Sequence, residues 1–331
     1  MKKGILLISL LLLTLCGSLR AQEVNSWVVF NAAGEMVGNV EFSTEESSEN
    51  DFLYEDISIP GELGEEDEEY DENIHLAYLG DIVNTGKNIT GKATGLEKAA
   101  VVLEYVNKKG EYEGMCSGAM VGPNLVLTAA HCLISSQYHP ARVVAAGMKK
   151  TKQGYPSAKV KNFFIPSEYS KPFKEIAEYY DEDEALFAEN EYGYDQYDYG
   201  LIVLKEDLSK QTGYFGLHLP PSSINVPIYA IGWSGDLPKR TLWKFPGFLT
   251  IFDDDFFEMS AYGKGGASGS PVVLQNRPSE IIGIHIQAGV VLENNGSALK
   301  ITPKIIQKVL EFRKKLAPQQ PAKKKQKNRS I

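Results

Sequence analysis

The sequence predicts an all-β fold of antiparallel strands, a barrel or a sandwich, for the part of the chain that follows Lys87. Two observations support this prediction. Short apolar segments alternate there with turns rich in Gly, Pro and Asn, as in antiparallel β proteins. About 230 residues lie between Lys87 and Ala317, which is enough for one two-lobed β domain with a sizeable core.

The expected strands follow one another at short intervals. They cover residues 99–106, 115–121, 125–130, 143–147, 158–165, 200–204, 228–233, 248–252, 272–274 and 281–286. Gly122, Pro123 and Asn124 separate the second strand from the third, and this turn sequence predicts a β-hairpin. The sequence shows no repeat of the length that builds solenoids.

A helix is expected at the end of this domain. Thr302 suits the N-cap, and Pro303 suits the first helical position. Apolar residues then follow a helical stripe to about Leu316, where Lys and Arg side chains complement the helix dipole. Residues 318–331 are basic, and we expect them to form a disordered tail.

Residues 1–21 have the composition of a signal peptide. Two lysines precede an apolar run over residues 5–15, which is too short to span a membrane, and cleavage is expected after Ala21. We therefore expect export to the periplasm or out of the cell, without stable insertion into a membrane. Leu15 and Cys16 partly match a lipoprotein signal, but the bulky Leu15 favours simple export over lipidation.

Residues 22–88 form a separate acidic segment. Residues 21–86 contain 18 Asp or Glu and no Lys or Arg, whereas the chain from Lys87 onward contains 31 basic and 25 acidic residues. The run 65–72 is nearly all acidic, and like charges at this density oppose independent folding. We expect a pro-segment that shields the following domain until it is removed, as in a zymogen; a solvated linker is the alternative. Residues 27–30 and 36–42 are expected to form a small hairpin within it.

Residues 171–199 interrupt the strand pattern with an acidic, tyrosine-rich stretch. Short helical turns are expected within it, and we interpret it as a surface insertion. Its carboxylates are possible Ca²⁺ ligands, but their spacing does not match a known calcium loop such as that of the EF-hand. A solvated loop is therefore the favoured interpretation.

Three residue types of nucleophilic catalysis occur in a suggestive order. Ser268 lies in the glycine-rich stretch 265–269, His131 lies beside Cys132, and Asp198 immediately precedes the apolar run 199–204. A serine hydroxyl needs an adjacent base, a histidine titrates near neutrality, and a buried carboxylate fixes the tautomer of that histidine. We expect Ser268 as nucleophile, His131 as base and Asp198 as orienting acid, with Asp195 as a weaker candidate for the acid.

The glycines beside Ser268 have a chemical reason. A tetrahedral oxyanion needs backbone N–H donors, and glycine allows the dihedral angles and the close approach that such a loop requires. The N–H groups of Gly266 and Ser268 are the expected oxyanion donors. If Cys16 leaves with the signal peptide, Cys116 and Cys132 remain as an even pair, which in an oxidising compartment predicts one disulfide rather than two free thiols.

Other classes of function find little support. The remaining histidines are scattered, so no metal-ligand spacing is present, and we expect neither a metal nor another cofactor. The chain has no phosphate-binding glycine loop and no stripe of basic and aromatic residues. Nucleotide and nucleic-acid binding are therefore not expected.

These residues together resemble the chymotrypsin-fold, trypsin-like serine peptidases, and most closely their bacterial glutamyl-endopeptidase branch. The matching segments are 128–132, 155–160, 198–200, 232–236, 266–272 and 282–285. The resemblance as a whole covers about residues 99–316. The resemblance implies two packed six-stranded antiparallel β-barrels with the site in the cleft between them and a C-terminal α-helix. It places the peptidase domain at residues 89–317.

The chain departs from the family at the specificity and activation positions. Ala267 replaces the aspartate that receives a new N-terminal amine in trypsin-like members, so activation must differ. Tyr262 replaces the aspartate that selects Arg or Lys. His285 matches the histidine that binds glutamate in the glutamyl branch, Gly263 stands where a hydroxyl residue is usual, and Lys264 is a possible source of compensating charge.

The sequence as a whole predicts an exported, monomeric serine endopeptidase that acts on proteins or peptides. Charge complementarity favours cleavage after Glu, with Asp as a second choice, although the donor set is incomplete. The alternative is a catalytically inactive binding or adhesion protein on the same fold, since a fold does not by itself determine function.

Overall fold

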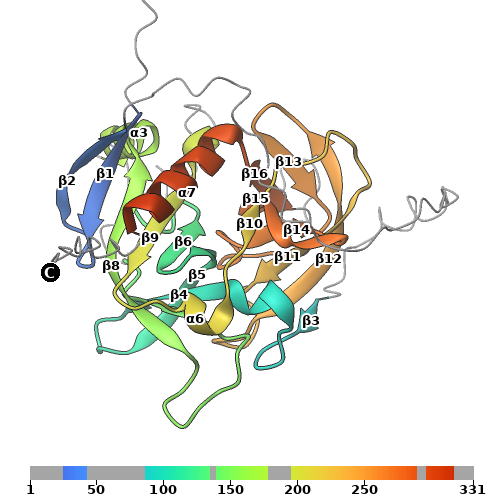
Figure 1. Ribbon diagram of the computed structural model, residues 1–331, viewed down its shortest axis with the longest axis horizontal. Helices are drawn as coiled ribbons and strands as arrows, with labels where there is room; N and C mark the ends of the chain where they lie inside the picture. Colours follow the sequence, from blue (N-terminus) through green and yellow to red (C-terminus); the bar gives the residue numbers. More distant parts are fainter. Residues whose placement is uncertain (1–24, 43–85, 135–138, 178–194, 289–295, 317–331) are drawn as a thin grey trace, which may run out of the picture.

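Six antiparallel strands close into the first barrel of the computed structural model (Figure 1), which describes residues 25–42, 86–134, 139–177, 195–288 and 296–316. These strands are β4 (Ala100–Val106), β5 (Tyr112–Gly122), β6 (Leu125–Thr128), β7 (Arg142–Val144), β8 (Ser157–Pro166) and β9 (Gly200–Leu204). The ring runs β8-β7-β4-β5-β6-β9 and closes where β8 pairs with β9. Most of its apolar side chains are buried, and every residue of β6 and β9 is buried.

A second closed barrel of six antiparallel strands packs against the first. Its strands are β11 (Pro227–Gly232), β12 (Trp243–Phe252), β13 (Phe256–Met259), β14 (Pro271–Leu274), β15 (Arg277–Ala288) and β16 (Gly296–Lys300). The ring runs β15-β14-β11-β12-β13-β16 and closes where β15 pairs with β16. Two short strands extend it, β3 (Lys87–Asn88) beside β12 and β10 (Gly216–Leu217) parallel to β15. One apolar core cluster includes side chains of both barrels, so the two pack as one body.

The C-terminal helix α7 (Pro303–Leu316) confirms the prediction made for it. The Thr302 Oγ1 accepts the N–H of Ile305 at 3.3 Å, and the Thr302 carbonyl accepts the N–H of Ile306 at 3.0 Å. The helix buries one apolar side against the barrels, including Val309 and Phe312. Shorter helical segments are η1 (Gly95–Ala99), α3 (Ser167–Ala177), η2 (Asp195–Tyr197) and α6 (Ser209–Thr212).

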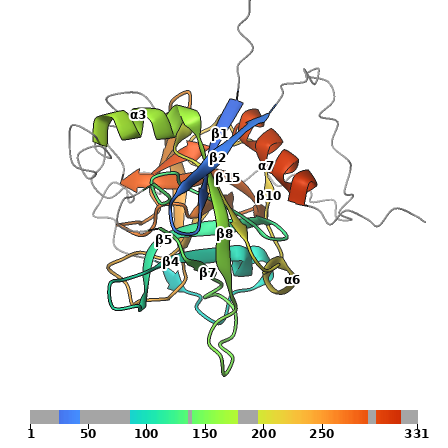
Figure 2. The same ribbon diagram turned by 90° about the vertical axis from the view of Figure 1, so that its left-hand side faces the viewer.

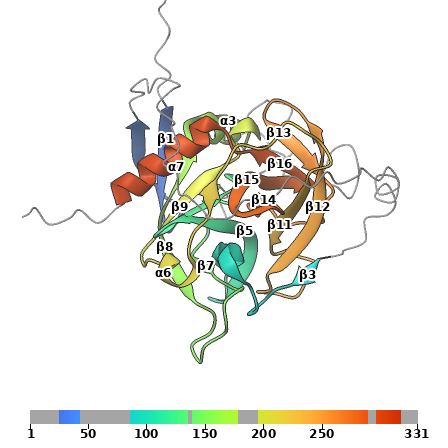
Figure 3. The same cartoon turned by 45° about the vertical axis from the view of Figure 1, so that its right-hand side comes forward.

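A hairpin from the N-terminal acidic segment lies on the first barrel. It consists of β1 (Asn25–Asn31) and β2 (Met36–Phe42), and β1 pairs antiparallel with β8. Figures 2 and 3 show the hairpin beside β8 and α7. The hairpin was expected from the sequence, but its attachment to the barrel was not.

The all-β class, the two barrels and the C-terminal helix are confirmed. Within the described part of the chain, no helix is long and apolar enough to cross a membrane. The signal peptide, the acidic run 65–72, most of the insertion at 171–199 and the basic tail lie outside the described residues. Of the insertion, residues 171–177 form the end of α3, in line with the helical turns expected there, and residues 195–197 form η2.

Candidate active site

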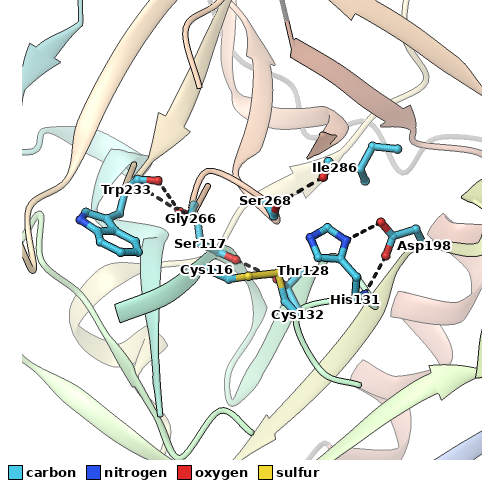
Figure 4. Close-up of a disulfide and its surroundings, with 10 residues drawn as sticks. All are labelled: Cys116, Ser117, Thr128, His131, Cys132, Asp198, Trp233, Gly266, Ser268 and Ile286. Atoms are coloured by element: carbon cyan, nitrogen blue, oxygen red, sulfur yellow. Dashed lines mark hydrogen bonds and ion pairs between the residues drawn. A yellow bond between two sulfur atoms is a disulfide. The ribbon is translucent and has the colours of Figure 1, made fainter. Parts of the chain in front are cut away.

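His131 and Asp198 meet between the barrels in the arrangement that a catalytic pair requires (Figure 4). The Nδ1 of His131 lies 2.7 Å from the Oδ2 of Asp198, and the backbone N–H of His131 donates to the Oδ1 at 2.9 Å. Asp198 is fully buried, whereas the His131 side chain keeps 17 % of its surface exposed. Two contacts to one carboxylate therefore fix both the position and the orientation of the imidazole.

The neighbouring Asp195 has another role. Its Oδ1 accepts the N–H of Gln196 at 3.0 Å, and its carbonyl accepts the N–H of Asp198 at 2.8 Å, so Asp195 shapes the turn before β9. Burial raises the pKa of Asp195, and the nearby negative charge of Asp198 adds to this effect. The geometry thus favours Asp198 over Asp195 as the partner of His131.

Ser268 lies on the other side of the His131 ring, on the loop that leads into β14 (Figure 4). Its Oγ donates to the Ile286 carbonyl at 3.2 Å. Hydrogen bonds between nucleophile and base often form only when substrate is bound. A rotation of the hydroxyl toward His131 is therefore the movement that catalysis would need.

The backbone before Ser268 is shaped for an anion. Gly266 has φ of +97°, a conformation that favours glycine, and a Cβ there would lie 2.6 Å from the Trp233 ring. Among the described residues, the N–H groups of Gly266 and Ser268 have no hydrogen-bond acceptor. These two expected donors are thus available to an oxyanion.

The disulfide between Cys116 and Cys132 is present, as the sequence predicted. It joins β5 to the turn that carries His131. His131 and the two cysteines lie close enough together to suggest metal ligands, with their candidate atoms within 4.8 Å of one another. Because both sulfurs are in the disulfide, this group lacks the thiolates that a metal would need.

Ser117 is a site residue that the sequence analysis missed. It is fully buried on β5, and its backbone N–H donates to the Ser268 carbonyl at 2.8 Å. Its Oγ donates to the Gly266 carbonyl at 2.9 Å and accepts the N–H of Trp233 at 2.8 Å. One serine of the first barrel thus holds the loop that carries Ser268 at two points and contacts Trp233, which follows β11, at a third. In the sequence, the only signal for this role was a polar residue directly after Cys116.

His285 and Gly263, two of the expected specificity residues, lie against each other. A Cβ on Gly263 would lie 2.8 Å from the Nε2 of His285, so a hydroxyl residue at 263 would clash unless the ring moved. His285 is buried, and among the described residues neither of its ring nitrogens has a hydrogen-bond partner. Burial, with a smaller effect from His131, lowers the pKa of His285 to about 4. The ring is therefore neutral near pH 7, with a donor and an acceptor unused.

Tyr262 and Lys264, the other two expected specificity residues, lie at the edge of this loop. The Tyr262 hydroxyl donates to the Asp236 carboxylate, and burial together with this hydrogen bond raises the pKa of Tyr262 to about 12. Burial opposes ionisation of Asp236, but hydrogen bonds from Ser234 and Tyr262 lower the pKa of that carboxyl group. Lys264 is exposed, and its positive charge acts on Asp236. Asp236 thus accepts a hydrogen bond from Tyr262 and interacts electrostatically with Lys264.

Comparison with known proteins finds one family model and several curated relatives that are similar to parts of this chain. Residues 92–244 match the family model described as Trypsin, a range that includes His131 and Asp198 and ends before Ser268. This part of the chain is similar to the trypsin-like serine peptidases. A glutamyl endopeptidase of Bacillus licheniformis is 30 % identical over 167 residues, which are 49 % of this chain and 46 % of that protein. A glutamyl endopeptidase of Staphylococcus epidermidis is 27 % identical over 186 residues, which are 56 % and 58 % of the two chains.

A solved structure supports the fold. The structure of a Glu endopeptidase in complex with MPD superposes with a TM-score of 0.52 at 20 % identity, over 70 % of this chain and 98 % of that chain. The trypsin-like chymotrypsin fold predicted from the sequence is thereby confirmed. The chain spans about half the length of the curated relatives that it matches.

Proposed function

We propose that this protein is a serine endopeptidase that uses Ser268, His131 and Asp198. The observation that carries the proposal is the pair of contacts between His131 and the buried Asp198, with Ser268 on the opposite side of the ring. The similarity to glutamyl endopeptidases and to the Trypsin family supports the same reaction class.

The reaction follows from the positions of these groups. His131 takes the proton of the Ser268 hydroxyl through its Nε2 while the Oγ attacks the scissile carbonyl carbon. The N–H groups of Gly266 and Ser268 stabilise the oxyanion. The proton on His131 then passes to the leaving amine, and an acyl-enzyme remains. Water, deprotonated by His131, releases the acid product and restores the serine.

Glutamate is the side chain that we propose before the scissile bond. The neutral ring of His285 has an N–H without an acceptor among the described residues, and Gly263 keeps a side chain from lying against that ring. Lys264 adds positive charge near the loop. A bound carboxylate would also favour the protonated ring, which strengthens the interaction. The printed names of the relatives, glutamyl endopeptidases, agree with this preference.

Export and maturation complete the proposal. Residues 1–21 direct the protein out of the cytoplasm. In the oxidising environment outside it, the disulfide between Cys116 and Cys132 is stable. Ala267 cannot form the activating ion pair of trypsin, because it has no carboxylate. Activation therefore proceeds by a cut in the acidic segment, without insertion of a new amine beside Ser268.

A fluorophosphonate probe tests the catalytic assignment, because it reacts with activated serines only. We expect covalent labelling of the mature protein, an increase in mass on the peptide that contains Ser268, and no labelling of Ser268→Ala. Labelling that is absent from the wild type, or equal in Ser268→Ala, would instead support an inactive binding protein on the same fold.

A peptide library tests the specificity. We expect cleavage after Glu at a kcat/KM at least tenfold higher than after Gln, since the amide lacks the charge that His285 and Lys264 would attract. Strong preference for Arg would contradict the assignment of Tyr262, Gly263 and His285.

A further inference from the structure

The N-terminal hairpin is built into the core of the first barrel. Trp27, Val28, Val29 and Phe30 are all buried, with Trp27 only 2 % exposed. Trp27, Val28 and Phe30 belong to the same apolar cluster as the strands of the barrel. A segment that only shields an enzyme from its surface would not contribute a tryptophan to its core.

Backbone and side-chain contacts attach this hairpin to β8 and α3. Five consecutive residues of β1, from Trp27 to Asn31, pair with residues of β8. The Oγ of Ser26 donates to the Oγ of Ser167 at 2.6 Å, and the Phe30 ring stacks on Phe163 at a centroid distance of 5.1 Å. The hairpin therefore continues the sheet of the barrel by strand addition, which supplies register as well as affinity.

Trp27 also reaches the segment that carries the catalytic acid. Its ring packs edge-on against Tyr199 at 5.5 Å and against Phe312 of α7 at 5.7 Å. Tyr199 directly follows Asp198 and is itself buried. The position of Asp198 therefore depends on the packing of Trp27 against Tyr199. Trp27 precedes the acidic run 65–72 and lies near the start of residues 22–88, the segment expected to be removed.

We propose that residues 25–42 stay bound to the barrel after the chain is cut between residues 43 and 85, so that the active form consists of two chains. In this form the hairpin acts as a positioning element for Asp198 through Trp27 and Tyr199. Retention of the hairpin is independent of the proposed function, whereas its effect on Asp198 rests on that function. The acidic run can then be removed while the hairpin side chains remain in the apolar core of the barrel.

Controlled cleavage tests retention. A recognition site for a sequence-specific protease is inserted between residues 43 and 85 of the full chain, in a Ser268→Ala background that prevents self-digestion. After cleavage, we expect the N-terminal fragment to co-elute with the barrel domain in size-exclusion chromatography and both fragments to appear by intact mass spectrometry. Elution of the fragment by itself would overturn the proposal.

Two substitutions in the cut protein test whether the packing of the buried Trp27 side chain holds the N-terminal fragment on the barrel. Trp27→Ala removes the ring that packs on Tyr199, and we expect the dissociation constant of the fragment to rise at least tenfold. Val37→Ala changes a side chain of the same hairpin that is 56 % exposed, and we expect no change. Equal effects of the two substitutions would contradict the proposed role of Trp27. Trp27→Phe, which keeps an aromatic ring, serves where Trp27→Ala does not fold.

The positioning of Asp198 has its own readout. In the cut protein with Ser268 restored, the rate of fluorophosphonate labelling is measured against pH. Loss of Trp27 loosens the contact of Asp198 with His131, so the acid limb of this profile should move to lower pH, and Trp27→Phe should restore it. A profile for Trp27→Ala that matches Val37→Ala would refute the positioning role. Absence of labelling in every form would refute the proposed function and leave the retention result intact.

Discussion

At the scale of single residues, Ser117 shows how one hydroxyl can organise a loop that belongs to another barrel. Its backbone and side chain contact Ser268, Gly266 and Trp233, so the geometry of the loop that carries Gly266 and Ser268 depends on a residue of the other barrel. Such residues are difficult to identify from sequence, because their partners lie more than a hundred positions away.

Substitution of Ser117 by Ala should therefore lower kcat more than it raises KM. The hydrogen bond to the Gly266 carbonyl is lost, and the N–H of Trp233 loses its acceptor. A buried hydrogen bond contributes about 1 kcal/mol, so we expect kcat to fall by roughly fivefold, less than for loss of an oxyanion donor itself. Steady-state kinetics with active-site titration measure the change.

Thr212→Val is the matched control for this prediction. Thr212 is also buried and its Oγ1 donates to a backbone carbonyl, that of Gly213 at 2.8 Å, but it lies in α6. We expect kcat of this variant to stay within twofold of the wild type. A fall in kcat of equal size in both variants would mean that Ser117 acts only through stability.

His285 should make the protein sensitive to acid. Its pKa is lowered by burial from 6.5 to about 4, so between these values the folded state binds fewer protons than the unfolded state. Its contribution to stability is therefore complete above about pH 6.5 and is lost as the pH falls toward 4, by roughly 3 kcal/mol in total. In urea unfolding, His285→Gln should show a smaller loss of stability than the wild type between pH 7 and pH 4.

His218→Gln provides the comparison for that experiment. His218 is partly exposed, and its Nδ1 contacts the Leu219 carbonyl at 2.6 Å. Carboxylates titrate in the same range, so only the difference between the two variants isolates His285. Identical pH dependence in both would show that the burial of His285 carries no acid sensitivity.

At the scale of elements, the disulfide ties the edge of β5 to the turn that presents His131. It closes a loop with a sequence separation of 16 residues. In the chain-entropy model such a link contributes about 3 kcal/mol. The double substitution Cys116→Ala and Cys132→Ala should lower the free energy of unfolding by about that amount. Urea unfolding measures this free energy. Unchanged stability of the variant would contradict the prediction, and so would an equal loss of stability in wild type and variant when a reductant is added.

Elements with strong local signals could be predicted, and those that depend on distant partners could not. The hairpin of β5 and β6 follows from Pro123 and Asn124 between two apolar runs, and α7 follows from its cap and stripe. Strand β16 has the sequence Gly-Ser-Ala-Leu-Lys, whose small residues give no β signal; it forms because β13 and β15 supply its partners.

The same distinction applies to the site. His131, Asp198 and Ser268 could be proposed from residue type, order and neighbouring glycines, and the structure brings the three together. The attachment of β1 to β8 could not be predicted, because residues 27–30 would be equally apolar in a free hairpin. Which surface an apolar strand covers is decided by tertiary packing and not by its own sequence.

At the scale of the whole molecule, a buried carboxylate links the two barrels. Glu104 of β4 is fully buried, and its two oxygens each accept an arginine Nε at 2.6 Å, from Arg142 of β7 and from Arg240 in the connection between β11 and β12. Arg240 also donates to the Tyr112 carbonyl at 2.9 Å. The segment before β12 is thus anchored to the first barrel by charge, while Ser117 anchors the nucleophile loop by hydrogen bonds.

Loss of this anchor should cost stability beyond that of an ordinary surface ion pair. In Arg240→Gln one oxygen of the buried Glu104 loses its cation; because the Arg240 side chain is 44 % exposed, water screens part of the effect, and we expect a loss of roughly 1–2 kcal/mol. Arg277→Gln is the control, since Arg277 is 53 % exposed and pairs with Glu280 on its own strand at 3.3 Å, so its loss should stay below about 0.5 kcal/mol. Urea unfolding at pH 7 measures both variants. Equal losses would show that Glu104 is sufficiently compensated by Arg142, and that the barrels are held together by their shared apolar core without this ion pair.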